Sequence, residues 1–229
     1  MENYAKMIAT KQQEGTHMGR FIIFCAAEFD ALEEPVGEED FILAADGGLR
    51  HLQKLRIAPH GILGDFDSLG YVPAGSQVFP VEKDDTDAML AARKGLELGY
   101  RDFLIYGGLD GPRLDHTIAN FQTLQFLADH GARGYLIGKD YIVTVLKNES
   151  ITFPAEAEGI FSLFCLGPDA RGITEQGLQY PLDGAVLTSG FPLGVSNHFL
   201  GRQAVISVKD GSLLAMWDRK NHFPRREIL

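Results

Sequence analysis

Short apolar runs alternate with segments of helical periodicity along the first 147 residues of the chain. The runs rich in β-branched and aromatic residues predict strands at Phe21–Ala26, Phe41–Ala45, Gly61–Leu63, Ser76–Val81, Phe103–Tyr106 and Tyr135–Ile137. Apolar residues that recur every three or four positions predict helices at Leu49–Leu55, Asp87–Leu98 and His116–His130. Because strands that alternate with helices are typical of βαβ units, we expect an α/β domain with a mostly parallel sheet over residues 21–147.

The pattern changes near residue 148, where helical periodicity stops and short strand-like runs follow one another. These runs predict strands at Ser150–Phe153, Ile160–Leu166, Ala185–Leu187, Gln203–Val208 and Ser212–Trp217. Turn signals such as Lys209-Asp210-Gly211 separate them, as in a hairpin. We therefore expect a C-terminal antiparallel β-sandwich domain over residues 148–218, with tails at residues 1–20 and 219–229.

Acidic residues and glycines follow directly after four of the strands expected in the first domain. They form the segments Asp46–Gly48, Gly64–Ser68, Lys83–Asp87 and Gly107–His116. The opposite edge of the expected sheet carries ordinary residues, such as RIAPH at 56–60. Since ligands of open parallel sheets bind at the carboxyl ends of the strands, this asymmetry predicts a ligand site at that edge.

The segment GDFDS at 64–68 places two carboxylates, Asp65 and Asp67, two positions apart. In an extended segment both project to the same side, away from Phe66. Neighbouring carboxylates repel each other unless a cation lies between them, and oxygen ligands suit Mg²⁺. These residues alone also fit a solvated turn. Because Asp46 and Asp87 follow neighbouring strands, a magnesium site is the interpretation that we favour.

The start of the helix at Asp87 is a candidate for phosphate binding. The free N–H groups and the positive dipole of a helix N-terminus suit a phosphate oxygen, and Lys83 adds a cation beside them. Asp84, Asp85 and Thr86 compete for the capping role. We assign Lys83 and Thr86 to a nucleotide site.

The glycine-rich segment 107–116 is the second candidate for phosphate binding. Arg113 offers a fork-shaped donor for phosphate oxygens, and His116 opens the next helix beside it. Asn120 lies on the same helix face as His116. A histidine alone at a helix start is more often structural, but the adjacent arginine favours a functional role.

Composition restricts the class of protein. A formal net charge of −10 argues against binding of nucleic acid polymers but leaves a nucleotide site open. No apolar run reaches about 18 residues and no signal-peptide pattern occurs, so we expect no membrane span and a cytoplasmic protein. Cys25 and Cys165 lie in apolar runs and are expected to be buried thiols. Neither a P-loop nor a dinucleotide-binding motif is present.

Taken together, these motifs resemble the thiamine pyrophosphokinase family, whose members transfer diphosphate from ATP to the hydroxyl of thiamine and release AMP. The matching segments are ADGGLRHL at 44–51, GDFDSL at 64–69, KDDTDAMLA at 83–91, GGLDGPRLDHTIAN at 107–120, GLQYPL at 177–182 and VSNHF at 195–199. The resemblance implies an α/β domain that carries the nucleotide and metal site, a β-sandwich, and a homodimer with thiamine at its interface.

The resemblance also implies roles for individual residues. Mg²⁺ would be held by Asp65, Asp67 and Asp87, with Asp46 as a further catalytic carboxylate close by. The residues implied at the ATP phosphates are Lys83, Arg113 and His116, with Asn120 ordering that site. The residues implied at thiamine are Ser196 and Asn197, which would face its aminopyrimidine, and Tyr180, which would stack on thiamine. One departure from the family pattern is Pro112, where a small residue is common.

Two other functions are compatible with these residues. A Mg²⁺-dependent phosphohydrolase could use the same acids to activate water. A catalytically inactive nucleotide-binding sensor would keep the site without turnover. The segment around Ser196 and Asn197 favours the kinase, because neither alternative needs a second polar pocket in the β-rich half.

Overall fold

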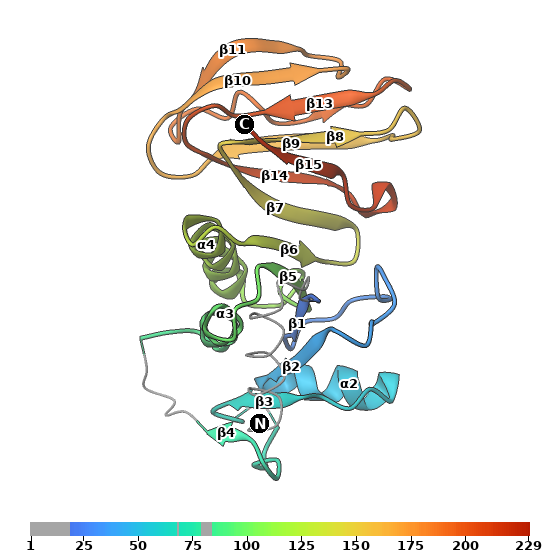
Figure 1. Cartoon of the computed structure of the whole chain (residues 1–229), viewed down its shortest axis with the longest axis vertical. Helices are drawn as coiled ribbons and strands as arrows, with labels where there is room; N and C mark the ends of the chain where they lie inside the picture. The colour runs from blue at the N-terminus through green and yellow to red at the C-terminus, as the bar shows by residue number, and fades with distance from the viewer. Residues whose placement is uncertain (1–18, 68, 79–83) are drawn as a thin grey trace, which may run out of the picture. The chain divides into compact units, whose positions relative to one another are not determined.

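The computed structural model describes residues 19–67, 69–78 and 84–229, which fold as two compact units (Figure 1). The first unit ends at Lys139 and the second spans Asp140–Leu229. This division differs from the expected boundary between residues 147 and 148. The reason is strand β7 (Tyr141–Lys147), which pairs antiparallel along its full length with β14 (Ser212–Asp218) of the second unit.

The first unit contains a parallel sheet with the strand order β6-β5-β1-β2-β3-β4. Its strands are β1 (Phe21–Phe24), β2 (Phe41–Ala45), β3 (Gly61–Gly64), β4 (Gln77–Val78), β5 (Asp102–Tyr106) and β6 (Arg133–Ile137). These strands pair parallel with one another, so the expected fold class is confirmed. Of the strand expected at Ser76–Val81, the structure describes residues 76–78 and places β4 there.

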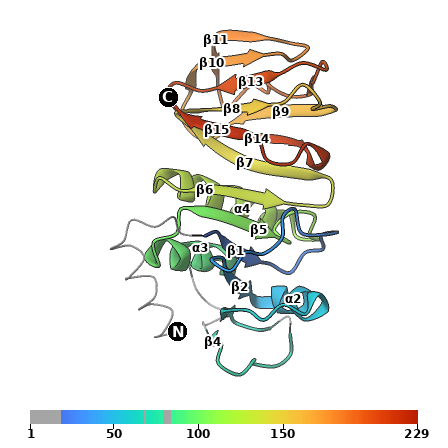
Figure 2. The same cartoon turned by 45° about the vertical axis from the view of Figure 1, so that its right-hand side comes forward.

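The helices of the first unit follow the strands as expected. They are η1 (Asp46–Gly48), α2 (Leu49–Leu55), α3 (Asp87–Glu97) and α4 (Leu114–Asp129). Helices α3 and α4 pack against each other, while α2 lies apart from them (Figures 1 and 2). In the described part of the chain, no helix is long and apolar enough to cross a membrane.

Small residues let helix α3 lie close to the sheet. Its buried positions include Ala91, Ala92 and Gly95. A Cβ on Gly95 would lie 2.4 Å from the ring of Phe103 and 2.8 Å from that of Phe21. Strand β1 is buried at all four positions, as expected for a central strand covered on both faces. The aromatic rings and the glycine thus fix the distance between α3 and the centre of the sheet.

The second unit contains two antiparallel sheets, with the strand orders β12-β9-β14-β7 and β11-β10-β13-β8-β15. Its strands, besides β7 and β14, are β8 (Glu149–Phe153), β9 (Ile160–Cys165), β10 (Ala170–Gln176), β11 (Leu182–Leu187), β12 (Asn197–His198), β13 (Ala204–Ser207) and β15 (Arg225–Ile228). The ring of Phe153, from one sheet, lies edge-on against Phe161 and Trp217 from the other. This buried aromatic core between two sheets confirms the expected β-sandwich.

The segment expected to be a C-terminal tail, residues 219–229, is part of the sandwich. It holds the 3₁₀ helix η2 (Arg219–Asn221) and strand β15, which pairs antiparallel with β8. The guanidinium of Arg226 donates to Glu149 Oε2 at 2.9 Å and Thr144 Oγ1 at 2.9 Å. The side chains of Arg226 and Glu149 are only 4% and 8% exposed. This polar segment thus pairs with β8 through its backbone and forms a buried ion pair with a residue far away in the chain.

The expected N-terminal tail, residues 1–20, lies outside the described residues up to position 18. Arg20 is tied to the first unit, since its backbone N–H donates to Asp40 Oδ1 at 2.8 Å and its guanidinium also binds that carboxylate. Arg20 thus belongs to the first unit although it precedes the first strand.

Candidate active site

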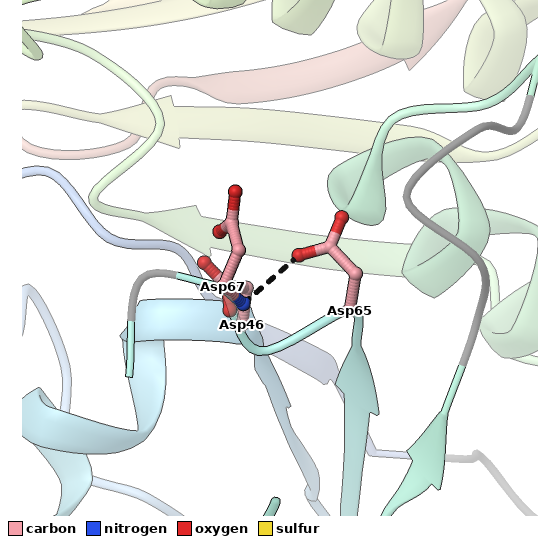
Figure 3. Close-up of side chains that lie close together, drawn as sticks. All are labelled: Asp46, Asp65 and Asp67. Carbon is pink, nitrogen blue, oxygen red and sulfur yellow. Dashed lines mark hydrogen bonds between the residues drawn. The ribbon is translucent and has the colours of Figure 1, made fainter. Parts of the chain in front are cut away.

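Three carboxylates converge where strands β2 and β3 end. Asp46 follows β2 directly, while Asp65 and Asp67 lie in the loop after β3. One carboxylate oxygen from each of the three lies within 4.8 Å of the others, a spacing that could hold a metal ion (Figure 3). The backbone N–H of Asp67 donates to Asp65 Oδ1 at 3.3 Å. The expected convergence of acids at this sheet edge is therefore observed for these three residues.

The backbone conformation explains how these carboxylates come so close. Phe66 has a φ of 61° and is buried, so the loop is a left-handed turn rather than the extended segment expected from the spacing. Gly64 has a φ of 150°, and a Cβ there would lie 3.0 Å from the Cα of Asp46. Glycine at position 64 thus allows the end of β3 to approach Asp46.

Asp87 lies at the first turn of helix α3, outside the three-carboxylate cluster. Burial raises the pKa of the Cys25 thiol to about 12, and the negative charges of Asp87 and Asp46 add to the shift. Both carboxylates therefore lie within electrostatic range of the thiol that follows β1. Thr86 is the N-cap of the helix and accepts a hydrogen bond from the N–H of Met89 at 3.2 Å. The metal-binding role of Asp87 stays a prediction.

The cationic residues expected at the phosphates are placed unequally. Lys83 lies outside the described residues. Arg113 is exposed and forms a two-pronged ion pair with Asp115, with distances of 3.1 and 2.5 Å. The hydrogen bond from Arg113 lowers the pKa of the Asp115 carboxyl to about 2. The hydrogen bond and the negative charge of Asp115 raise the pKa of Arg113, and the negative charge of Asp67 adds to this shift. The guanidinium therefore lies within electrostatic range of the acidic cluster. His116 is exposed in the first turn of α4.

Asn120 orders the glycine-rich loop from inside the protein. Its side chain is buried, and its amide donates to the carbonyl of Gly108 at 2.8 Å. A Cβ on Gly107, where φ is 67°, would lie 2.5 Å from the carbonyl oxygens of Cys25 and Ala27. The conformation of the loop therefore depends on the absence of a side chain at Gly107 and on the hydrogen bond from the Asn120 amide to Gly108.

The residues expected at thiamine lie in the second unit. Tyr180 is 61% exposed, whereas Asn197 is only 3% exposed. Ser196 adopts a left-handed φ of 61°, and its N–H donates to Ser162 Oγ at 3.0 Å. The side chain of Asn197 accepts from the N–H of Tyr180 at 2.9 Å and donates to its carbonyl at 2.8 Å. Tyr180 and Asn197, 17 positions apart, are thus brought together.

Two acidic residues beside these sites were not singled out by the sequence. Asp115 accepts hydrogen bonds from the guanidinium of Arg113. Its position two residues after Arg113 was the signal in the sequence that could have indicated this pair. Glu175 is buried in β10 and accepts from Asn197 Nδ2 at 3.0 Å. The sequence signal that could have indicated its burial is its spacing: Glu175 lies two positions after the apolar Ile173, so in a strand both side chains point to the same inward face.

The fold and the site define a class. A parallel α/β unit with three carboxylates clustered at its strand ends, followed by a β-sandwich, is a two-domain protein with a candidate metal site in its first domain. Comparison with known proteins identifies the family. The family model described as thiamin pyrophosphokinase, catalytic domain, matches residues 32–136, and the model of the vitamin B1 binding domain of the same family matches residues 148–213. The chain belongs to the thiamin pyrophosphokinase family.

Individual relatives agree with this assignment. A thiamine pyrophosphokinase of Bacillus subtilis (strain 168) is 28% identical over 187 residues, covering 77% of this chain and 86% of that protein. A crystal structure of thiamine pyrophosphokinase from Bacillus subtilis has a TM-score of 0.76 at 24% identity and covers 86% of this chain and 98% of its own. Thiamin pyrophosphokinase from Candida albicans has a TM-score of 0.66 at 14% identity, with 87% and 88% covered. These structural likenesses show the fold.

Proposed function

We propose that this chain transfers the terminal diphosphate of ATP to the hydroxyl of thiamine, giving thiamine diphosphate and AMP. The observation that carries the proposal is the convergence of Asp46, Asp65 and Asp67 in a chain whose two halves match the catalytic and vitamin B1 binding domains of one enzyme family.

The acidic cluster fits a magnesium ion. Three carboxylates that approach within 4.8 Å offer only hard oxygen donors, which suit Mg²⁺ better than softer metals. Asp65 and Asp67, with Asp46 or Asp87 as further ligands, would hold the ion. Bound there, Mg²⁺ supplies charge neutralisation for the phosphate oxygens of ATP.

The remaining residues of the first unit position the nucleotide. Arg113 and Lys83 offset negative charge as AMP leaves, and His116 and Thr86 lie at helix starts where phosphate oxygens bind. For Arg113 to do so, its fork must exchange Asp115 for a phosphate. Asn120 holds the glycine-rich loop in place through its hydrogen bond to the carbonyl of Gly108. Such a reaction depends on in-line placement more than on covalent participation by the protein.

Thiamine is assigned to the second unit. The exposed ring of Tyr180 stacks on thiamine, and Ser196 offers a hydroxyl to the aminopyrimidine. Asn197 is fully engaged with the protein in this structure, so its contribution is to hold these two neighbours. The hydroxyl oxygen of thiamine attacks the β-phosphorus of ATP, and the bond from this phosphorus to the oxygen that bridges to the α-phosphate breaks, so that AMP leaves and the diphosphate moves as one unit. The hydroxyl proton passes to a nearby carboxylate.

The chain is also proposed to act as a homodimer in the cytoplasm. Apolar side chains are exposed along one segment of the second unit, with Phe191 at 65%, Leu193 at 48% and Val195 at 38%, and such a patch fits contact with a second copy. Both Cys25 and Cys165 are free thiols, as expected in a reducing compartment.

A single assay tests the function. The protein is mixed with ATP, Mg²⁺ and thiamine, and thiamine diphosphate and AMP are expected in equal amounts. Release of inorganic phosphate without thiamine would instead favour the phosphohydrolase, and ATP binding without AMP would favour the sensor. The metal site is tested with the variant Asp67→Asn, which removes one carboxylate with little change in volume. Its turnover is expected to fall about 100-fold with an unchanged circular dichroism spectrum. Full turnover of this variant at saturating Mg²⁺ would refute the metal site.

A further inference from the structure

The side-chain amide of Asn197 uses its whole hydrogen-bonding capacity inside the second unit. Its Oδ1 accepts from the backbone N–H groups of Tyr180 at 2.9 Å and His198 at 3.0 Å. Its Nδ2 donates to the carbonyl of Tyr180 at 2.8 Å and to Glu175 Oε2 at 3.0 Å. An amide has two donor hydrogens and two acceptor lone pairs, so none remains for a ligand.

These partners also determine which way the amide points. Two N–H donors face Oδ1, and two oxygen acceptors face Nδ2. Rotating the amide by half a turn would set N–H groups against N–H groups and oxygens against oxygens. Of the two acceptors, the carbonyl of Tyr180 comes from the loop that Asn197 positions, whereas Glu175 comes from strand β10 of the other sheet. Glu175 is thus the anchor of the amide that is independent of the loop.

Glu175 is an unusual residue for its place. It is 1% exposed on the inward face of β10, and its Oε1 has no hydrogen-bond partner among the described residues. Burial raises the pKa of this carboxyl to about 7, against the opposing effect of the Asn197 hydrogen bond. A leucine would fill a similar volume without this desolvation cost. The carboxylate therefore lowers stability at its own position while it aligns a neighbour.

We propose that Glu175 is a positioning residue for thiamine recognition, which fixes the amide of Asn197 between the two sheets and so places the backbone of Tyr180 and of the Ser196–His198 segment. The proposal rests on the proposed function, because it assigns thiamine to this segment. Because Glu175 is itself only 1% exposed, we assign it no direct contact with thiamine. It acts through Asn197, and the exposed ring of Tyr180 is the group whose position it controls.

The test compares three variants by steady-state kinetics and denaturant unfolding. Glu175→Leu removes the acceptor and is expected to raise KM for thiamine roughly fivefold, the equivalent of one hydrogen bond, with KM for ATP and kcat within twofold of the parent. Its stability is expected to equal or exceed that of the parent. Glu175→Gln keeps an acceptor oxygen for Asn197 Nδ2, so its KM for thiamine is expected to equal that of the parent.

The control is Ile173→Ala, which creates a cavity two positions earlier on the same inward face of β10. It is expected to lower stability with no change in KM for thiamine. An unchanged KM for thiamine in Glu175→Leu, or an equal rise in the control, would overturn the positioning role. Failure of the proposed function has a different result, since the parent protein itself would then form no thiamine diphosphate.

Discussion

The pH dependence of stability gives a direct measure of how Glu175 is buried. Its carboxyl has a pKa of about 7 in the folded protein against an ordinary value of 4.5. Between these two pH values the folded state keeps a proton that the unfolded chain has lost. The free energy of unfolding therefore falls as pH rises through this interval, by about 1.4 kcal/mol for each pH unit, or on the order of 3 kcal/mol in all.

Glu175→Gln removes this titration and leaves the others in place. Denaturant unfolding of the parent and the variant at half-unit steps from pH 4.5 to 8 isolates the contribution, because all shared titrations cancel in the difference. The variant is expected to match the parent near pH 4.5 and to become more stable by roughly 3 kcal/mol above pH 7. Two stability curves that run parallel across this range would show that Glu175 is not desolvated in solution, and the reasoning would be refuted.

Two further substitutions test other contacts. Arg226→Met leaves the Glu149 carboxylate buried without its guanidinium, so a loss of about 3–5 kcal/mol in the free energy of unfolding is expected by urea titration; a loss below 1 kcal/mol would contradict the buried ion pair. Asn120→Ser removes the amide that holds the carbonyl of Gly108, and KM for ATP is expected to rise about fivefold while KM for thiamine stays constant. Equal changes in both constants would point to a general loss of structure instead.

The arrangement of the fold could be inferred from local patterns where the chain is regular. Buried runs such as Phe21–Phe24 have no polar alternation, which is the pattern of a central parallel strand, and glycines and acids directly after them indicated the sheet edge. The second unit was harder. Strand β10 reads ARGITEQ and β15 reads RREI, and neither looks apolar enough for a strand. Their placement depends on partners distant in sequence, which periodicity does not contain.

The candidate site shows the same division. Strand-end positions predicted that Asp46, Asp65 and Asp67 would share one edge of the sheet, because the carboxyl ends of parallel strands meet there. They also predicted Asp87 there, which lies outside the cluster, and they did not predict the left-handed backbone of Phe66. The ion pair of Arg113 with Asp115 and the hydrogen bond of Asn197 with Glu175 do not follow from it. In each pair several acceptors in the sequence could bind the donor groups of one side chain, and the three-dimensional structure determines which acceptor is nearest.

If thiamine binds in the second unit as proposed, the saturated amide of Asn197 has a consequence for the design of thiamine analogues and inhibitors. A compound that reaches for this residue must first break internal hydrogen bonds of equal quality, so the exchange yields little net affinity. Chemical variation is better directed at the open face of the Tyr180 ring, where substituents on a heterocycle alter stacking without disturbing the protein. Selectivity in this half of the molecule would then come from ring electronics and shape rather than from added polar groups.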